Sequence, residues 1–327
     1  MVQIARRAVP TLLAGVAAGA LCWAGLTFEG RRSVPAAWPT VEGDTFPRTV
    51  RLPDGGTFTL TRAPRRIVLA SATVVDLATA LVGPERVAGL CSLAFVASAL
   101  TLAPEPWRAI PTHDHFTAEA VLAVQPDLVL CNDYNDQGTA AALRRAGVPV
   151  LVLPGPANLA DCTRSLALLG AVLGVEDRAF ALERDLDRRV RALRDAAPPP
   201  PRKRALCFTC NPTGSYTGGP GTLHHEALVL AGFANAAAEA GIEGHAPISV
   251  EQIGALDPDL LVVDAPPDGG RGSLAFLREN PILSRLRALT TGAVVELPQA
   301  LYATGSHHVV AAAEAIAAGV RRAERAR

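Results

Sequence analysis

Short apolar runs alternate with amphipathic stretches along most of the chain from residue 46 onward. Residues 49–52 and 57–60 are β-prone runs around Pro53-Asp54-Gly55-Gly56, which is typical of a hairpin. Further strands are expected at 65–70, 86–90, 127–131 and 148–153, with helices at 74–82, 118–124 and 139–146. Strands that alternate with helices in this way predict parallel β-α-β units and a sheet that is covered on both faces.

The middle of the chain has a helical period instead. Between 158 and 195 leucine and valine recur at helical spacing, which predicts one long helix or two abutting helices. The prolines at 198–201 end it. The alternation then restarts, with strands expected at 205–209, 260–264 and 294–297 and helices at 223–231, 250–256 and 309–324. The predicted fold class is α/β, with lobes at 46–155 and 202–327 and a linking helix at 156–201.

The first 45 residues differ from the rest. Arg6 and Arg7 precede an apolar stretch that runs from residue 8 to about 26, the pattern of an export signal. The stretch is close to the length of a membrane span, so an uncleaved anchor stays open. Cys22 is a candidate lipid-attachment site, but Leu21 before it is bulkier than such a site favours. We interpret 1–45 as a signal segment and tether and expect a periplasmic protein, with tethering through the N-terminus left open.

Charge and cysteine content narrow the function classes. The 31 basic and 31 acidic residues cancel, so no global positive field points to a nucleic-acid partner. Of the six cysteines, Cys22 lies in the signal segment. The odd number that remains argues against a dense disulfide framework. Cys207 and Cys210 form a CxxC on or beside a strand rather than at a helix start, which favours buried thiols over a redox pair.

The two halves of the chain repeat one pattern. Residues 120–130 read A-V-L-A-V-Q-P-D-L-V-L and residues 252–262 read Q-I-G-A-L-D-P-D-L-L-V. In each half a glutamate, Glu119 or Glu251, opens the helix, where its charge favours the helix N-terminus. The equivalent position of the two stretches predicts a structural duplication.

The order of these motifs resembles one family. The similar stretches are T-V-R-L-P-D-G-G-T-F-T-L at 49–60, G-P-E-R-V-A-G-L at 83–90, T-A-E-A-V-L-A-V-Q-P-D-L-V-L at 117–130 and I-S-V-E-Q-I-G-A-L-D-P-D-L-L-V-V-D at 248–264. Together they resemble class III periplasmic binding proteins of iron–siderophore, haem and cobalamin ABC importers. The resemblance covers about 48–322. It implies two Rossmann-like lobes joined by a long helix, a ligand cleft between them, and little opening or closing.

The resemblance also implies partners and a docking device. The partners are a permease dimer and a small-molecule metal chelate, and the binding protein itself is a monomer. One surface glutamate in each lobe pairs with arginines of the membrane subunits, and Glu119 and Glu251 match those positions. Acids at helix starts also have a purely structural explanation.

Candidate ligand contacts in the loops beyond the carboxyl ends of the expected strands, where open α/β sheets bind ligands, are Tyr134, Tyr216, Tyr302 and His307. His113 and His115 lie just before the helix that Glu119 opens, in a segment that the resemblance implies to be a wall of the cleft. His113 and His115 point to one side if their segment is extended, and could then bind a metal. The three tyrosines offer flat apolar faces to planar or chelated ligands. His224-His225 and His307-His308 are weaker pairs, and the run at 218–221 is expected to shape a tight turn rather than hold an anion.

The ligand and the reaction class follow from these residues. A cleft rich in His and Tyr favours a ferric chelate or a corrinoid, with haem or a free transition-metal ion as alternatives. No resident cofactor is expected, since the metal belongs to the ligand. The enzyme alternative is a metallohydrolase using His113, Asp114 and His115, but no HExxH, GxSxG or GxGxxG pattern accompanies them. We therefore expect a transport receptor rather than an enzyme.

Overall fold

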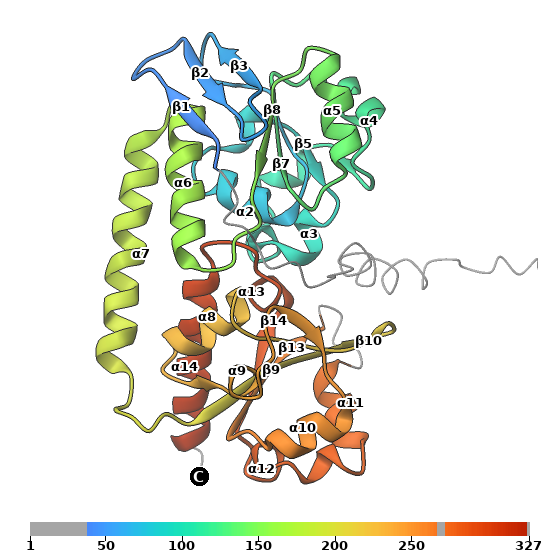
Figure 1. Ribbon diagram of the computed structural model, residues 1–327, viewed down its shortest axis with the longest axis vertical. Coiled ribbons are helices and arrows are strands. Elements are labelled where there is room, and N and C mark those ends of the chain that lie inside the picture. Colours follow the sequence, from blue (N-terminus) through green and yellow to red (C-terminus); the bar gives the residue numbers. More distant parts are fainter. Residues whose placement is uncertain (1–37, 267–271, 326–327) are drawn as a thin grey trace, which may run out of the picture.

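The computed structural model describes residues 38–266 and 272–325, which form two α/β lobes joined by a pair of helices (Figure 1). The expected export signal lies outside the described residues. The N-terminal hairpin is as expected, with β2 (Arg48–Arg51) antiparallel to β3 (Thr57–Leu60). A further strand, β1 (Thr40–Glu42), pairs with β2. The expected tether at 27–45 is therefore wrong for 40–42, which are too few residues to show a period.

The N-terminal lobe, which is the upper lobe in Figure 1, is built on five parallel strands in the order β6-β5-β4-β7-β8. The strands are β4 (Ile67–Leu69), β5 (Val87–Cys91), β6 (Thr112–His113), β7 (Leu128–Asn132) and β8 (Val150–Leu153). The helices are α2 (Ala72–Thr79), α3 (Ala94–Ala97), α4 (Ala118–Ala123) and α5 (Gln137–Arg145), with short 3₁₀ turns at Pro84–Arg86, Ala99–Thr101 and Trp107–Ala109. Ser71, Thr117 and Asp136 accept backbone N–H groups at helix starts, which satisfies amides that have no partner inside the helix.

The linking segment consists of two helices, α6 (Leu159–Leu173) and α7 (Glu176–Ala196). Gly174 ends α6 in the left-handed conformation with φ of 66°, which favours glycine. A side chain at Gly170 would come within 2.7 Å of the Ala179 Cβ, so the missing side chain lets the helices approach. Within the described residues, no helix combines the length and apolar character needed to cross a bilayer.

The C-terminal lobe, which is the lower lobe in Figure 1, has a mixed sheet in the order β12-β10-β9-β13-β14, with β11 also paired to β9. The strands are β9 (Arg204–Asn211), β10 (Gly214–Gly218), β11 (Ala234–Asn235), β12 (His245–Pro247), β13 (Leu260–Ala265) and β14 (Val294–Pro298). The helices are α8 (Leu223–Leu230), α9 (Ala236–Glu239), α10 (Val250–Leu256), α11 (Ser273–Glu279), α12 (Arg287–Thr290), α13 (Gln299–Tyr302) and α14 (Val309–Arg325), with a 3₁₀ turn at Leu283–Arg285. Unlike the upper sheet, this one has an antiparallel edge, because β10 runs against both β9 and β12.

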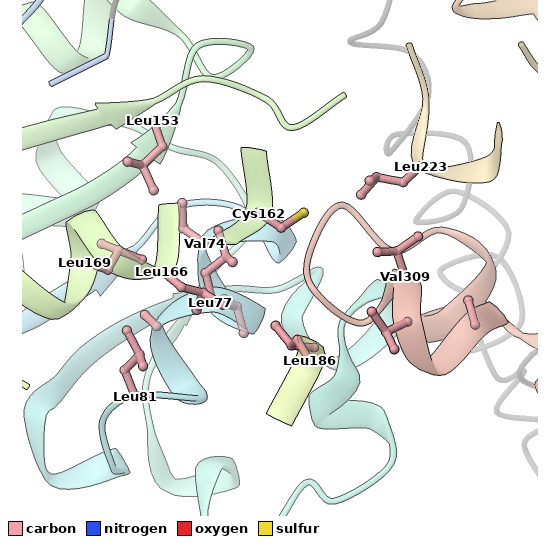
Figure 2. Close-up of a cluster of buried hydrophobic side chains, with 14 of the residues drawn as sticks. Val74, Leu77, Leu81, Leu153, Cys162, Leu166, Leu169, Leu186, Leu223 and Val309 are labelled. Atoms are coloured by element: carbon pink, nitrogen blue, oxygen red, sulfur yellow. The ribbon is translucent and has the colours of Figure 1, made fainter. Parts of the chain in front are cut away.

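The largest apolar cluster runs through both lobes (Figure 2). It joins Leu77 of α2, Leu166 of α6, Leu186 of α7, Leu223 of α8 and Val309 of α14, all of them buried. Separating the lobes would expose this shared apolar surface to water. Burial of apolar surface is the main favourable contribution to folding, so the separation is strongly unfavourable. The two lobes and the linking helices are therefore held together by one continuous core.

The sequence repeat corresponds to a structural repeat. Thr117 caps α4 and Ser249 caps α10, and the face carrying Val121 or Ile253 is buried in each lobe. Each helix is followed by a residue with positive φ, 47° at Gln125 and 36° at Asp257. The aspartate after the proline then binds the chain entering the neighbouring strand. Asp127 accepts the amides of Arg65 and Arg66, and Asp259 accepts that of Arg204.

Candidate functional site

His113 lies where β6 ends, beside Cys91 of β5, and its carbonyl accepts the Ser92 amide at 2.9 Å. The side chain is half-buried, and within the described part of the chain its buried Nε2 has no hydrogen-bond partner. Burial lowers the pKa of His113, while the nearby Asp114 carboxylate opposes this. A lowered pKa keeps the imidazole neutral near pH 7, so a ring nitrogen is available to bind a metal.

His115 does not share that environment. The strand ends at His113, and His115 is exposed in the bend that leads to α4. The expected arrangement with both rings on one side required an extended segment through His115, and the structure does not have one. Within 38–266 and 272–325, no group of three or more His, Cys, Asp or Glu side chains could hold a metal ion.

Tyr134 follows β7 at the same edge of the upper sheet. Its side chain is 47% exposed, but its hydroxyl points inward and donates to the Thr73 Oγ1 at 2.8 Å. Burial of the hydroxyl raises the pKa of Tyr134 to about 12, so the phenol stays neutral. A side chain at Gly155 would lie 3.5 Å from the tyrosine ring, in ordinary contact. Tyr134 is therefore a fixed ring with a free face, which suits a flat ligand.

Tyr216 belongs to the lower lobe and lies on β10, between Thr209 of β9 and Pro247 of β12. It is half-buried, and its hydroxyl lies 3.1 Å from the Thr213 Oγ1 in the turn between β9 and β10. The sequence pattern placed this residue in a loop. It is instead part of a strand that is paired on both sides, which gives the ring a more fixed position.

Tyr302 and His307 are interior residues, each 4% exposed. The Tyr302 ring lies 4.7 Å from the His224 ring, and burial raises the pKa of Tyr302 well above its usual range. The His307 ring lies 4.2 Å from that of His308, and burial, His308 and Arg189 lower its pKa to about 3. Contact of either residue with a ligand stays a prediction, while the structure shows them as packing residues.

The contact between His224 and His245 had no signal in the sequence. His224 at the start of α8 packs against His245 of β12, with ring centres 5.2 Å apart at 88°. Burial lowers the pKa of His224 to about 3 and that of His245 to about 4. Only the pairing of β10 with β12, which places His245 opposite Gly218, brings them together.

A buried contact between the lobes was also missed. The Asp76 carboxylate on α2 accepts the Ala99 amide at 2.8 Å and the Ser306 hydroxyl at 3.0 Å. Asp76 is 2% exposed, and burial raises its pKa to about 7. Next to it, a side chain at Gly305 would lie 2.2 Å from the Thr73 Oγ1, so the two lobes touch directly. In the sequence, the one hint of this contact was a single aspartate among the apolar residues Val74, Val75 and Leu77.

The glycine run at 218–221 forms a tight crossing, as expected. A Cβ at Gly219 would lie 1.8 Å from the Ile242 carbonyl oxygen, and the Gly219 amide donates to the Gly244 carbonyl. Gly221 has φ of 83°. The run thus serves the approach of two backbone segments.

The cysteines behave as buried thiols. Cys91, Cys131, Cys162 and Cys207 are buried, Cys210 is half-buried, and Cys207 and Cys210 both lie on β9. Burial raises the pKa of Cys131 to about 12 and also raises those of Cys162 and Cys207. Thiols held protonated in this way are poor nucleophiles and poor metal ligands.

The glutamates of the repeat are on the surface. Glu119 lies in the first turn of α4 and Glu251 in the first turn of α10, and both are exposed. Among the described residues, neither takes part in an ion pair. Hydrogen bonds from its own amide and from Ser249 hold the pKa of Glu251 below its usual range.

A cavity of about 190 Å³ lies at the amino ends of the lower sheet, lined in part by Lys203, Asp259, Arg287 and Ala293. Leu260 and Val294, the first residues of β13 and β14, also line it. Ligand sites of open α/β sheets lie at the carboxyl ends instead. We therefore do not connect this cavity with the tyrosines and His113.

Comparisons with known proteins agree with this architecture. The chain is 30% identical over 179 residues to a cobalamin-binding protein of Halobacterium salinarum, covering 54% of this chain and 48% of that protein. It thus spans about half the length of the curated relatives it matches.

Two solved structures have the same fold. A periplasmic haem-binding protein from Roseiflexus sp. RS-1, in apo form, superposes with a TM-score of 0.69 at 24% identity, covering 80% of this chain and 99% of that one. An ABC-type Fe³⁺-hydroxamate transport system protein from Saccharomonospora viridis gives 0.65 at 27% identity, covering 83% and 98%. The pattern of the periplasmic binding protein family matches residues 105–301, more than half of the chain, and the chain belongs to that family.

Proposed function

We propose that this protein is the extracytoplasmic receptor of an ABC importer, and that it binds a ferric chelate or a corrinoid and delivers it to the permease. The observation that carries the proposal is the end of the upper sheet where the carboxyl ends of its strands lie. There a neutral His113 with an unpartnered buried nitrogen and the half-exposed ring of Tyr134 both follow strands of one sheet. One offers a metal ligand and the other a flat apolar surface.

The named ligands of the similar proteins support a metal held in an organic chelator. They are cobalamin, haem and a ferric hydroxamate. A chelated metal leaves few coordination positions open, and a single imidazole can fill one of them. Haem has the same requirement and is the second candidate. A free metal ion needs more protein ligands than His113 supplies.

The test is a binding panel on the full chain purified after export. Cyanocobalamin, haemin and ferric desferrioxamine are titrated while tryptophan fluorescence and visible absorption are recorded. Saturable one-to-one binding of one probe, lost or weakened in His113→Ala or Tyr134→Ala, supports the proposal. Binding of none of the three, together with tight binding of aqueous Fe³⁺, Zn²⁺ or Mn²⁺, would overturn the chelate assignment.

We further propose that Glu119 and Glu251 dock the protein on the two membrane subunits. Their support is the equivalent exposed position in the two lobes. Replacing both with arginine inverts the charge at each docking point, so uptake should be abolished while ligand affinity is unchanged. Undiminished uptake by the double variant would remove the docking role.

A further inference from the structure

The exposed faces of α4 and α10 correspond residue by residue. Glu119 and Leu122 are three residues apart on α4, so their side chains share one face. The repeat places Glu251 and Gly254 at the same positions on α10. In both helices the inward position is filled by a buried aliphatic residue, Val121 or Ile253. The two helices are therefore seated on their lobes in the same orientation, one in the upper and one in the lower lobe of Figure 1.

The two lobes differ at one position of that face. Leu122 is 38% exposed, whereas its counterpart Gly254 has no side chain. The gap is filled from outside the repeat by Ile282, which precedes the 3₁₀ turn at Leu283–Arg285. A Cβ built on Gly254 would lie 3.4 Å from the Ile282 Cγ2, and Ile282 is 53% exposed. Each lobe thus presents a branched aliphatic side chain beside the helix that carries its glutamate.

Exposed aliphatic side chains at two equivalent places are unusual for a surface that stays in water. A scattered single apolar residue needs no explanation, but a duplicated acid-plus-aliphatic pair indicates a partner with matching repetition. The nearby carboxylates have no ion-pair partner among the described residues, so the partner's complementary charge is positive. Interfaces commonly combine a buried apolar contact with a charged rim.

We infer that Leu122 and Ile282 are the apolar contacts of the docking surface, each inserting beside a basic side chain of one membrane subunit of the importer. This inference rests on the proposed docking of Glu119 and Glu251 and extends it from charge to packing. The occupant is a dimer of membrane subunits, because the two pairs lie on separate lobes of one binding protein. Its matching surface presents, on each subunit, a cation next to an apolar patch.

The experiment measures the affinity of the full chain for its cognate permease–ATPase complex, held in lipid nanodiscs. The variants are Leu122→Ser, Ile282→Ser and the pair. Leu102→Ser and Phe180→Ser are matched controls, because these side chains are 59% and 60% exposed and belong to other parts of the chain than α4, α10 and the turn after Ile282. We expect each docking variant to weaken binding about fivefold and the pair about 25-fold, with the controls unchanged.

Salt and charge variants separate this inference from the docking proposal. Glu119→Gln and Glu251→Gln should weaken docking most at low ionic strength, because exposed charges are screened by salt. The loss in the serine variants should be the same at low and high salt. Unfolding temperatures within about 2 °C of the parent protein establish that each variant is folded.

The outcomes are distinct. Docking that is weakened by the glutamine variants but unaffected by both serine variants overturns the apolar contact and leaves the glutamate docking intact. Serine variants that fail while the controls and the glutamine variants dock normally support the apolar surface and remove the role of the charges. Normal docking by all four single variants and the serine pair overturns both.

Discussion

The two lobes start from one repeated unit and reach different sheets. The upper lobe has five parallel strands, and its candidate contacts His113 and Tyr134 follow strand ends. The lower lobe has an antiparallel edge made by β10 and β12, and its contact Tyr216 lies within a strand. The repeated part, helix then Pro-Asp then buried strand, is the same in both. The difference teaches that the shared unit sets the frame of each lobe, while the strands added outside it determine which side chains surround a ligand.

The largest expected effect is the loss of stability that the buried histidines of the lower lobe cause at low pH. In the lower half of the chain His224 and His307 have pKa values near 3, and His245 and His308 near 4, all through burial. Their folded pKa values lie below the unfolded value of 6.5, so this stability is present above pH 6.5 and lost as pH falls. As the pH falls from about 6.5 to 4, each of these histidines should lower the free energy of unfolding by about 1.4 kcal/mol per pH unit.

Urea unfolding at pH 7.0 and 5.5 measures this loss. The variant His224→Phe should lose less stability on acidification, and His115→Gln, at an exposed position of the upper lobe, should behave like the parent protein. Equal slopes in all three proteins would show that acid sensitivity does not reside in the lower-lobe histidines.

The second effect concerns Asp76, which joins the lobes. Its pKa rises from 3.8 to about 7 on folding. A raised carboxyl pKa gives stability that is present below about pH 4 and lost as pH rises to about 7, by at most about 4 kcal/mol. Asp76→Asn mimics the protonated group and should remove this dependence, leaving the protein more stable than the parent at pH 8. Thermal unfolding from pH 4 to 8 tests it, and a lower stability at pH 8 would contradict the assignment.

The third effect tests the repeat itself. Asp127 accepts two backbone amides, and Asp259 accepts one amide and an Arg287 guanidinium N–H at 2.8 Å. Replacing either with alanine should lower the free energy of unfolding by about 2 kcal/mol, because hydrogen bonds to charged groups contribute about 1.5–3 kcal/mol. Denaturant unfolding measures both. Losses that differ by more than about twofold would break the equivalence of the lobes, and Asp187→Ala, at an exposed position of α7, is the control.

The smallest effect concerns ligand affinity. His113→Ala should weaken binding of the probe that the panel identifies by at least about tenfold, or about 1.4 kcal/mol. His115→Ala should leave the dissociation constant unchanged, because this residue is exposed outside the strand. Titration of the two variants side by side decides it, and an unchanged dissociation constant in His113→Ala would remove its role as a ligand contact.

Much of the fold was predictable because its causes are local. The strands at β4, β5, β7, β8, β9, β13 and β14 are mostly apolar runs, and α4, α8, α10 and α14 begin at the expected residues. β10 and β12 were not predicted, since Gly214–Gly218 and His245–Pro247 carry no apolar period. Their hydrogen bonds to neighbouring strands, rather than their composition, make them strands.

The candidate site was predictable only in part. The position of Tyr134 after a buried strand follows from the rule that ligands gather at carboxyl strand ends, whereas the short strand β6 that ends at His113 was not predicted. Tyr302 and His307 satisfy the same rule by sequence position, yet they are buried against other elements. The docking face shows the same limit, because no sequence pattern places Ile282 beside Gly254.

The amino-acid sequence was enough to predict the order of the main helices and apolar strands and the duplicated helix–Pro-Asp–strand unit with Glu119 and Glu251 at its helix starts. These depend on periodicity, capping and turn residues within a few positions of each other. The tertiary structure alone decided that Asp76 meets Ser306, that His224 meets His245 and that one core joins both lobes. Such contacts depend on which faces pack together over long separations, and no local pattern carries that information.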